Sequence, residues 1–332
     1  MKPFPFIFTC LWGLVITSIL IIATWPSAGV DSMVFADADS YTRLVRVAHL
    51  NNTWEWFSPM LPGSNPVDPE TIQWSRWVDF LMWLPATILG QFMDFTQALK
   101  ISGYIFSPFW LFVSGLALAW AASSICRPYT IVLLAILFFS RPGILNYSYP
   151  GRADHHVILI LLMLLSLGAI IRLFLWPASK KWAVAAGFFQ AAALLVSLEA
   201  LPSTALSMFM LSLIWIHTGK SRASLYYTST LSVSALFGLL LSIPVSEWHF
   251  NELDRISLVY VLAFSLVALF WWIIRCTPTI PGKTLRILCG GLGAFTCAGL
   301  MYAIQPDFFH GPMANVPVDV RSLWLQHIHE FQ

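Results

Sequence analysis

The sequence predicts an all-α protein that crosses a membrane several times. Of its 332 residues, 58% are hydrophobic and only 10% are charged, and the mean hydropathy is +0.73. Soluble globular proteins carry about 25% charged residues, so this composition indicates a polytopic membrane protein. Nine apolar runs are candidates for transmembrane helices, because about 20 apolar residues in a helix cross a bilayer. They cover residues 5–25, 103–125, 129–146, 157–175, 182–198, 204–217, 223–244, 257–274 and 285–304.

The first apolar run, 5–25, is expected to stay in the protein as a membrane anchor. It is longer than the core of a signal peptide, and Lys2 is the only charged residue before it. No clear small-x-small cleavage site follows it. A cleaved signal peptide is the alternative.

A tenth apolar stretch, 78–95, contains polar residues, among them Asp79 and Asp94. If it crossed the membrane, Asp154 and the later acids would lie on the side opposite to Asp39. We therefore place it outside the bilayer or in its surface, as an amphipathic helix.

The charged residues separate to the two sides of this predicted topology. All 16 acidic residues lie in, or at the edge of, alternate gaps between the apolar runs, whereas the other gaps carry only basic residues. Those basic residues are Lys2, Arg127, Arg172, Lys180, Lys181, Lys220, Arg222, Arg275, Lys283 and Arg286. By the positive-inside rule, their side and the N-terminus are cytoplasmic, and the acidic side is external. We expect a bacterial inner membrane, with the chemistry on its periplasmic face.

Several classes of site are missing from the sequence. The five cysteines fall within the predicted spans or at their cytoplasmic ends, so none is placed for an external disulfide. No CxxC or HExxH pattern predicts a zinc site, and no phosphate loop, Rossmann fingerprint or nucleic-acid motif occurs. We therefore expect no nucleic-acid partner.

The first external loop carries paired acids at the start of a predicted helix. Asp39 or Ser40 suits the N-cap of this helix. Asp37 and Asp39 could hold a divalent cation, because hard cations prefer carboxylate oxygens. Arg43 and Arg46 follow one and two turns later, where their guanidinium groups could bind a phosphate. An N-cap with two local salt bridges is the alternative.

The second external loop places Asp154, His155 and His156 directly before the fourth predicted span. Ionisable residues at the mouth of a transmembrane helix usually have a function. Asp154 and His156 could ligate a metal, and Arg152 could contact a phosphate. Alternatively, Asp154 caps the helix and the histidines lie at the membrane interface.

Three further external residues carry weaker signals. Glu199 lies where two short spans meet, and either lines a cavity or caps a tight reversal. Arg255 belongs to a stretch of acids and aromatic residues that suits an interfacial belt. Glu330 lies on an amphipathic stretch near the end of the sequence and carries almost no signal by itself.

Taken in order along the chain, these motifs resemble the membrane half of an oligosaccharyltransferase catalytic subunit, in the GT-C class of glycosyltransferases. That family has an essential Asp, a small residue and an aromatic in its first external loop, and Asp39-Ser40-Tyr41 is similar. Its second loop reads approximately Ser-Gly-x-x-Asp-x-Asp, and residues 151–156 keep the Gly and the first Asp, with His156 in place of the second. Its Thr/Ser-x-x-Glu element is matched at Glu330 only by the Glu and the apolar second position.

The resemblance implies a single GT-C-like transmembrane domain over residues 1–332. Its external segments would be the loops 26–100 and 140–156 and the final segment 305–332. The C-terminal soluble domain of the family, which recognises the acceptor, is absent from this sequence.

The resemblance also implies an activity: transfer of a sugar or oligosaccharide from a polyprenyl-(di)phosphate donor in the bilayer to an acceptor protein, lipid or glycan. Mg²⁺ or Mn²⁺ would assist at the external face. The metal site would combine Asp39, Asp154 and Glu330, with His156 as a fourth ligand and Asp37 as a further candidate. The residues facing the phosphate would be Arg43, Arg46 and Arg152, and other site candidates are His155, Glu199 and Arg255.

Three alternative functions stay open at this point. A GT-C transferase could use a polyprenyl-monophosphate sugar to modify a lipid or polysaccharide. A membrane transporter would place ionisable residues deep within the spans, whereas here they lie at span ends. A non-catalytic scaffold would make the acidic clusters incidental.

Overall fold

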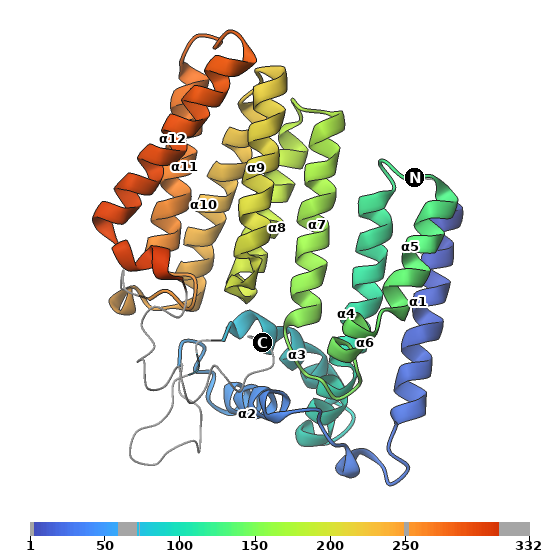
Figure 1. Cartoon of the computed structure of the whole chain (residues 1–332). Coiled ribbons are helices and arrows are strands. Elements are labelled where there is room, and N and C mark those ends of the chain that lie inside the picture. The colour runs from blue at the N-terminus through green and yellow to red at the C-terminus, as the bar shows by residue number, and fades with distance from the viewer. Residues whose placement is uncertain (1–2, 59–71, 73, 249–251, 312–332) are drawn as a thin grey trace.

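A computed structural model describes residues 3–58, 72, 74–248 and 252–311, and within these ranges the protein is all-α, as predicted. Long helices stand side by side in a bundle, and two shorter ones lie across one end of it (Figure 1). We call this the loop end; the other end of the bundle is the opposite end.

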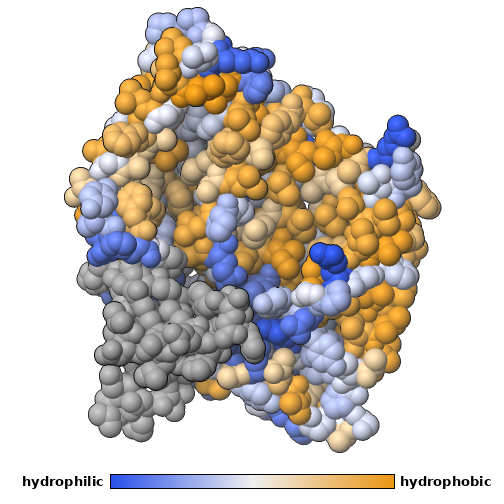
Figure 2. Space-filling model, viewed as in Figure 1, coloured by the Kyte–Doolittle hydropathy of each residue, from blue (hydrophilic) through white to orange (hydrophobic). Residues whose placement is uncertain are grey.

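Seven helical segments are long and apolar enough to cross a membrane, which makes the chain an integral membrane protein. They are α1 (Pro3–Thr24), α4 (Phe95–Ala122), α7 (His156–Leu175), the 3-10 turn η2 (Leu198–Ala200) continued by α9 (Leu201–Thr218), α10 (Arg222–Ser242), α11 (Leu258–Cys276) and α12 (Lys283–Ile304). Figure 2 shows a broad hydrophobic surface over the bundle, as lipid contact requires.

The predicted number of nine spans is not confirmed. The other two predicted runs form α5 (Pro128–Ser140) and α8 (Lys180–Val196), which have 13 and 17 residues. The run 129–146 was expected to be one helix, but the chain breaks at Arg141. Pro142 explains the break, because a proline disfavours the helical conformation of the residue before it and instead begins α6 (Pro142–Tyr147).

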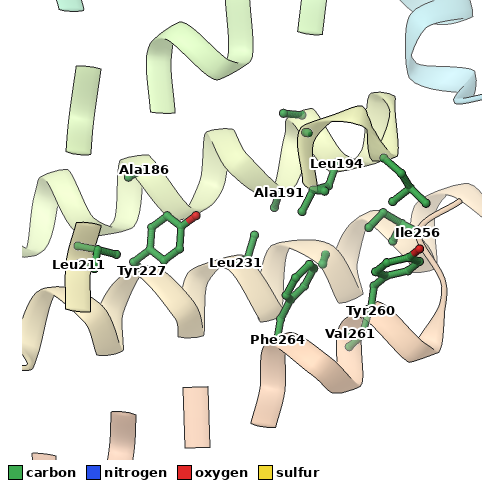
Figure 3. Packing of buried hydrophobic residues seen from close by; sticks show 14 of the residues in the cluster. Ala186, Ala191, Leu194, Leu211, Tyr227, Leu231, Ile256, Tyr260, Val261 and Phe264 are labelled. Carbon is green, nitrogen blue, oxygen red and sulfur yellow. The ribbon is translucent and has the colours of Figure 1, made fainter. Parts of the chain in front are cut away.

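The helices α7, α8, α10 and α11 pack into the largest hydrophobic core of the described residues. Figure 3 shows alanine and leucine side chains of α8 against aromatic and branched side chains of α10 and α11. Among them Tyr227 of α10 is completely buried, and Tyr260 of α11 donates a hydrogen bond of 2.6 Å to the carbonyl of Leu253. Small residues on α8 let its neighbours approach closely, which is typical of helix packing in membranes.

The predicted amphipathic helix outside the spans is α3 (Arg76–Leu89), which has 14 residues and does not reach the length of a transmembrane helix. It packs on α4 and on α2 (Ala38–Thr53), which follows the short turn η1 (Val30–Ser32). At the same end lie η3 (Val245–Glu247) and η4 (Pro306–His310). All the external loops that were predicted to carry chemistry and that the structure describes therefore meet at the loop end.

The close contact of α8 with α10 gives a first prediction. A Cβ atom on Gly187 would lie 2.4 Å from the backbone oxygen of Tyr227, so Gly187→Ala must push the two helices apart. We expect a loss of about 1–3 kcal/mol of unfolding free energy, although alanine is the better helix former. Gly291→Ala in α12, where no atom lies within 4 Å, is the control. Equilibrium unfolding in mixed detergent measures both, and equal effects would contradict the packing.

Candidate functional site

Asp154 lies at the centre of a polar cluster at the start of α7. Its Oδ1 accepts hydrogen bonds of 2.7 Å from the backbone N–H and from Nδ1 of His155. Its Oδ2 lies 2.5 Å from Nδ1 of His156. The two imidazole rings stack with centroids 4.4 Å apart. A single carboxylate thus orients both histidines.

Glu199 approaches the same cluster from η2, between α8 and α9. Its Oε1 lies 3.5 Å from Nε2 of His155, and its Oε2 lies 4.0 Å from Nε2 of His156. The sequence left the role of Glu199 open between lining a cavity and capping a reversal. The structure places its carboxylate beside the Nε2 atoms of both histidines, whereas Asp154 contacts their Nδ1 atoms.

The turn before Asp154 is fixed by backbone contacts with α4 and with the first loop. Gly151 has φ +84°, which L-residues rarely adopt, and its N–H donates to the carbonyl of Tyr104 at 3.0 Å. Its own carbonyl accepts from Ala36 at 3.1 Å. The hydroxyl of Ser107 donates to the carbonyl of Arg152. These bonds fix the direction in which the chain enters α7, and the N-cap of α7 is His155 rather than Asp154.

The first external loop reaches the cluster through α2, but its N-cap differs from the prediction. Asp37, not Asp39 or Ser40, caps α2, and its Oδ1 accepts from the N–H and the hydroxyl of Ser40 at 2.8 and 2.6 Å. The buried Ser40 hydroxyl in turn accepts a hydrogen bond of 3.1 Å from the N–H of Ala153. The start of α2 is therefore bonded to the residue directly before Asp154.

Arg152 of the second loop makes a further contact with the first loop. Its Nη2 lies 3.6 Å from Oδ2 of Asp37, and its guanidinium lies over the ring of Tyr147 at 4.6 Å. The Nε atom of Arg152 is buried and has no hydrogen-bond partner among the residues that the structure describes. One donor of its guanidinium is thus buried and unpaired among the described residues.

The cluster is charged at neutral pH. Burial alone would raise the pKa of Asp154, but the hydrogen bonds from His155 and His156 outweigh it and hold that pKa well below its usual range. Burial would likewise lower the pKa of His155, but the bonds to Asp154 and Glu199 raise it to about 9. Asp154 is therefore a carboxylate and His155 an imidazolium near pH 7, and a cation that binds here must displace a proton.

The cluster also brings together side chains that could hold a metal ion. Ligand atoms of Asp154, His155 and His156 all lie within 4.8 Å of one another, and within the described part of the chain this is the one such group. Asp37 is not part of this group, and its carboxylate caps α2. Asp39 is exposed in the first turn of α2 and lies outside the group. Glu330, a further predicted ligand, lies outside the described residues.

Arg43 and Arg46, the other predicted phosphate contacts, bond instead to a buried carboxylate of α3. Nη1 of Arg43 lies 2.9 Å from Oδ1 of Asp79, and Nη2 of Arg46 lies 2.9 Å from Oδ2. Arg76 adds a third contact of 3.1 Å. None of these four side chains is more than 5% exposed. Neither arginine forms the local salt bridge that the alternative interpretation expected, because their partner lies in another helix.

Arg255 lies apart from the Asp154 cluster. Its guanidinium binds Glu252 through two hydrogen bonds of 2.9 and 2.7 Å. It lines a cavity of about 60 Å³ together with Arg46 and Arg76. The structure therefore brings Asp154, His155, His156, Glu199 and Arg152 together, with Asp37 bonded to the rim, and leaves Arg255 with the arginines that hold α2 on α3.

Comparison with known proteins identifies the fold. No protein-family model and no curated protein matches the sequence. The structure of the oligosaccharyltransferase AglB from Archaeoglobus fulgidus, in complex with an inhibitory peptide and a dolichol-phosphate, matches 99% of this chain with a TM-score of 0.72 and 13% identity. The chain has the GT-C fold of the membrane part of an oligosaccharyltransferase. It spans 41% of the length of that protein.

Two further structures of the A. fulgidus oligosaccharyltransferase agree. One, tethered to an acceptor peptide with an NVT sequon, matches 91% of this chain and 38% of its own length, with a TM-score of 0.67 and 13% identity. Another, a complex with Zn and sulfate, matches 92% of this chain and 41% of its own length, with a TM-score of 0.64 and 12% identity. The predicted resemblance is confirmed at the level of the fold.

The buried contact of α2 with α3 gives a second prediction. Asp79→Asn keeps the shape of the side chain but leaves three buried guanidiniums without their counter-charge, so we expect a loss of about 3–5 kcal/mol of unfolding free energy. Asp31→Asn removes an exposed carboxylate that pairs with Lys100, and the expected loss is below about 1 kcal/mol. Equilibrium unfolding compares the two, and a small effect of Asp79→Asn would show that the arginines do not depend on this carboxylate.

Proposed function

We propose that the protein is an oligosaccharyltransferase-like membrane glycosyltransferase. It would transfer a sugar or oligosaccharide from a polyprenyl-(di)phosphate donor to an acceptor at the loop end. The observation that carries this proposal is the position of the Asp154 cluster, at the mouth of a transmembrane helix, in a chain whose GT-C fold matches over nearly its whole length. The matched structures contain dolichol-phosphate, an acceptor peptide or zinc, which supports the same classes of ligand here.

We propose that Asp154 and His156 hold a divalent metal, completed by Asp39 and Glu330. One carboxylate oxygen and an imidazole nitrogen within 4.8 Å of each other fit Mn²⁺, and Mg²⁺ if oxygen ligands dominate. Bound there, a divalent ion would neutralise the negative charge that develops on the leaving phosphate. Asp39, exposed in the first turn of α2, would orient or deprotonate the acceptor nucleophile.

Arg152 is the phosphate contact that the geometry favours over Arg43 and Arg46. Its guanidinium lies over Tyr147, whose ring centroid is 4.4 Å from that of His156, whereas the guanidiniums of Arg43 and Arg46 are bound to the buried carboxylate of Asp79. A fixed positive charge at this place stabilises the leaving anion without reorganisation. Glu199 and His155 would hold the second face of the cluster in place.

An apolar cleft between α7 and α9 suits the polyprenyl tail of the donor. It has a volume of about 430 Å³ and is lined by Ile160, Leu167 and Phe174 of α7 and by Leu206 and Met210 of α9, among others. The cleft begins at Ile160, one turn of α7 after His156. Glu199 lies in η2, the turn directly before α9. A tail lying in this cleft would present its phosphate to the cluster while staying in contact with lipid.

We also propose that the loop end faces the outside of the cell and that the N-terminus is cytoplasmic. The support is the charge separation along the sequence, in which the short loops at the opposite end carry only basic residues.

A transfer assay tests the site. With the intact protein in its native membrane and donor lipid from the same cells, we expect Asp39→Asn and Asp154→Asn each to lower the transfer rate by about 100-fold or more, since each removes a charged group at the reacting atoms. Glu247→Gln, an exposed acid of the loop end, is the control and should keep the full rate. Unchanged transfer in both site variants would refute the assignment.

Mass spectrometry of the lipid consumed in the same assay distinguishes a polyprenyl-diphosphate donor from a polyprenyl-monophosphate donor.

Metal removal gives an independent prediction. Chelation of divalent ions should abolish transfer in the same assay, and added Mn²⁺ should restore it more fully than Mg²⁺, because the cluster offers imidazole nitrogen. Full activity in the presence of a strong chelator would contradict the metal-assisted mechanism while leaving the fold assignment intact.

A further inference from the structure

A second polar cavity, of about 310 Å³, lies at the opposite end of the bundle. It is formed by the turn between α9 and α10, residues 219–221, and by residues 277–280 after α11. The helix α9 has 18 residues, which separates this cavity from Glu199 by about 27 Å. In Figure 1 this is the upper end of the yellow and orange helices. The proposed transfer chemistry does not use it.

Among the described residues, no counter-ion balances the positive charge of this cavity. Lys220, Arg222 and Arg275 line it, together with the hydroxyl-bearing residues Ser221 and Thr277. No acidic residue lines it, and within the described ranges no hydrogen bond or ion pair involves the side chain of any of the three cations. Three like charges around one polar cavity raise its potential and attract an anion.

Arg286 fixes the two turns that form this cavity. Its Nη1 donates to the carbonyl of Ile216 at 2.9 Å, and its Nε donates to that of Ile280 at 3.0 Å. Gly219 has φ +73°, and a Cβ atom there would lie 2.9 Å from Nη2 of Arg286. The shape of the cavity is thus fixed by the fold, because the Arg286 guanidinium bonds to both of the turns that line it.

An apolar cleft between α11 and α12 lies next to the polar cavity. It has a volume of about 330 Å³ and is lined by Leu266, Leu269 and Phe270 of α11 and by Leu292 of α12, among others. Ile274 lines both the cleft and the polar cavity, so the two adjoin at the end of α11. A basic polar cavity beside an apolar cleft matches the division of a phospholipid into headgroup and acyl chain.

We propose that this composite site binds an anionic phospholipid. The phosphate of the headgroup lies in the polar cavity with Lys220, Arg222 and Arg275, and an acyl chain lies in the cleft along α11. Basic pockets between transmembrane helices on the positively charged face are known to hold anionic headgroups. The adjoining cleft favours a lipid over a soluble phosphate, because a soluble ion would gain nothing from it.

The proposed lipid explains how α12 is held in the bundle. Only 11% of the 18-residue apolar stretch of α12 is buried within the protein. The buried residues described in this helix are Gly293 and Met301. An acyl chain between α11 and α12 covers part of the remaining surface, and the headgroup joins the turn before α10 to the residues after α11. The lipid would thus act as a structural component of the bundle.

Native mass spectrometry of the full chain, purified in mild detergent and titrated with phosphatidylglycerol, tests the proposal. We expect a bound phosphatidylglycerol molecule whose affinity falls by about tenfold or more in the variant K220Q/R222Q/R275Q. The matched control, R127Q/K180Q/K181Q, removes three charges from the same end without touching the cavity, and should keep the wild-type affinity. An equal loss in the control would overturn the proposal in favour of diffuse surface charge.

Two further arms identify the ligand. Phosphatidylcholine should bind at least about tenfold more weakly than phosphatidylglycerol, and inorganic phosphate should not displace bound lipid. Equal binding of the two lipids, or displacement by phosphate, would overturn the assignment. Circular dichroism verifies that the triple variant is folded, and R275Q alone should show a smaller loss of affinity in the same direction. No readout here depends on glycan transfer, so the outcome is separate from that of the proposed function.

Discussion

The hydrogen bonds of the Asp154 carboxylate are the interaction on which the organisation of the loop end depends. One carboxylate orients two imidazoles, and Glu199 meets His155 from a different pair of helices. The N–H of Ala153 is bound to Ser40 of α2, so the first loop meets the same point. Groups from three distant parts of the sequence are therefore held by contacts of 2.5–3.5 Å next to a transmembrane helix, as a preorganised site requires.

The rest of the bundle keeps this arrangement rigid. Asp79 fixes α2 on α3 through three arginines, and this buried contact determines where Asp37 and Asp39 stand. Close packing of α7 and α10 on α8 fixes the separation of the helices that carry the cluster. The same frame leaves apolar clefts that face the lipid, one near the cluster and one near the basic cavity. The geometry of both ends thus depends on the packed centre of the bundle.

The sequence predicted an all-α membrane bundle because lipid allows few alternatives to apolar helices, but its count of nine spans is not confirmed. It placed Asp154 beside its two histidines because the three residues are adjacent. It could not predict that Arg43 and Arg46 bind Asp79, since that partner lies more than 30 residues away and only the packing of α2 on α3 unites them. The approach of Glu199 to His155 also depends on tertiary structure. The N-cap at Asp37 is instead a local bond to Ser40, and it begins α2 two or three residues before the predicted cap.

Pulsed electron paramagnetic resonance of Mn²⁺ bound to the full chain in nanodiscs tests the central claim most directly. A metal held by the Asp154 cluster must show nitrogen modulation from an imidazole ligand, and this signal should disappear in Asp154→Asn and His156→Gln but persist in Glu247→Gln. Bound Mn²⁺ without nitrogen coupling, or coupling that survives in both site variants, would contradict the account.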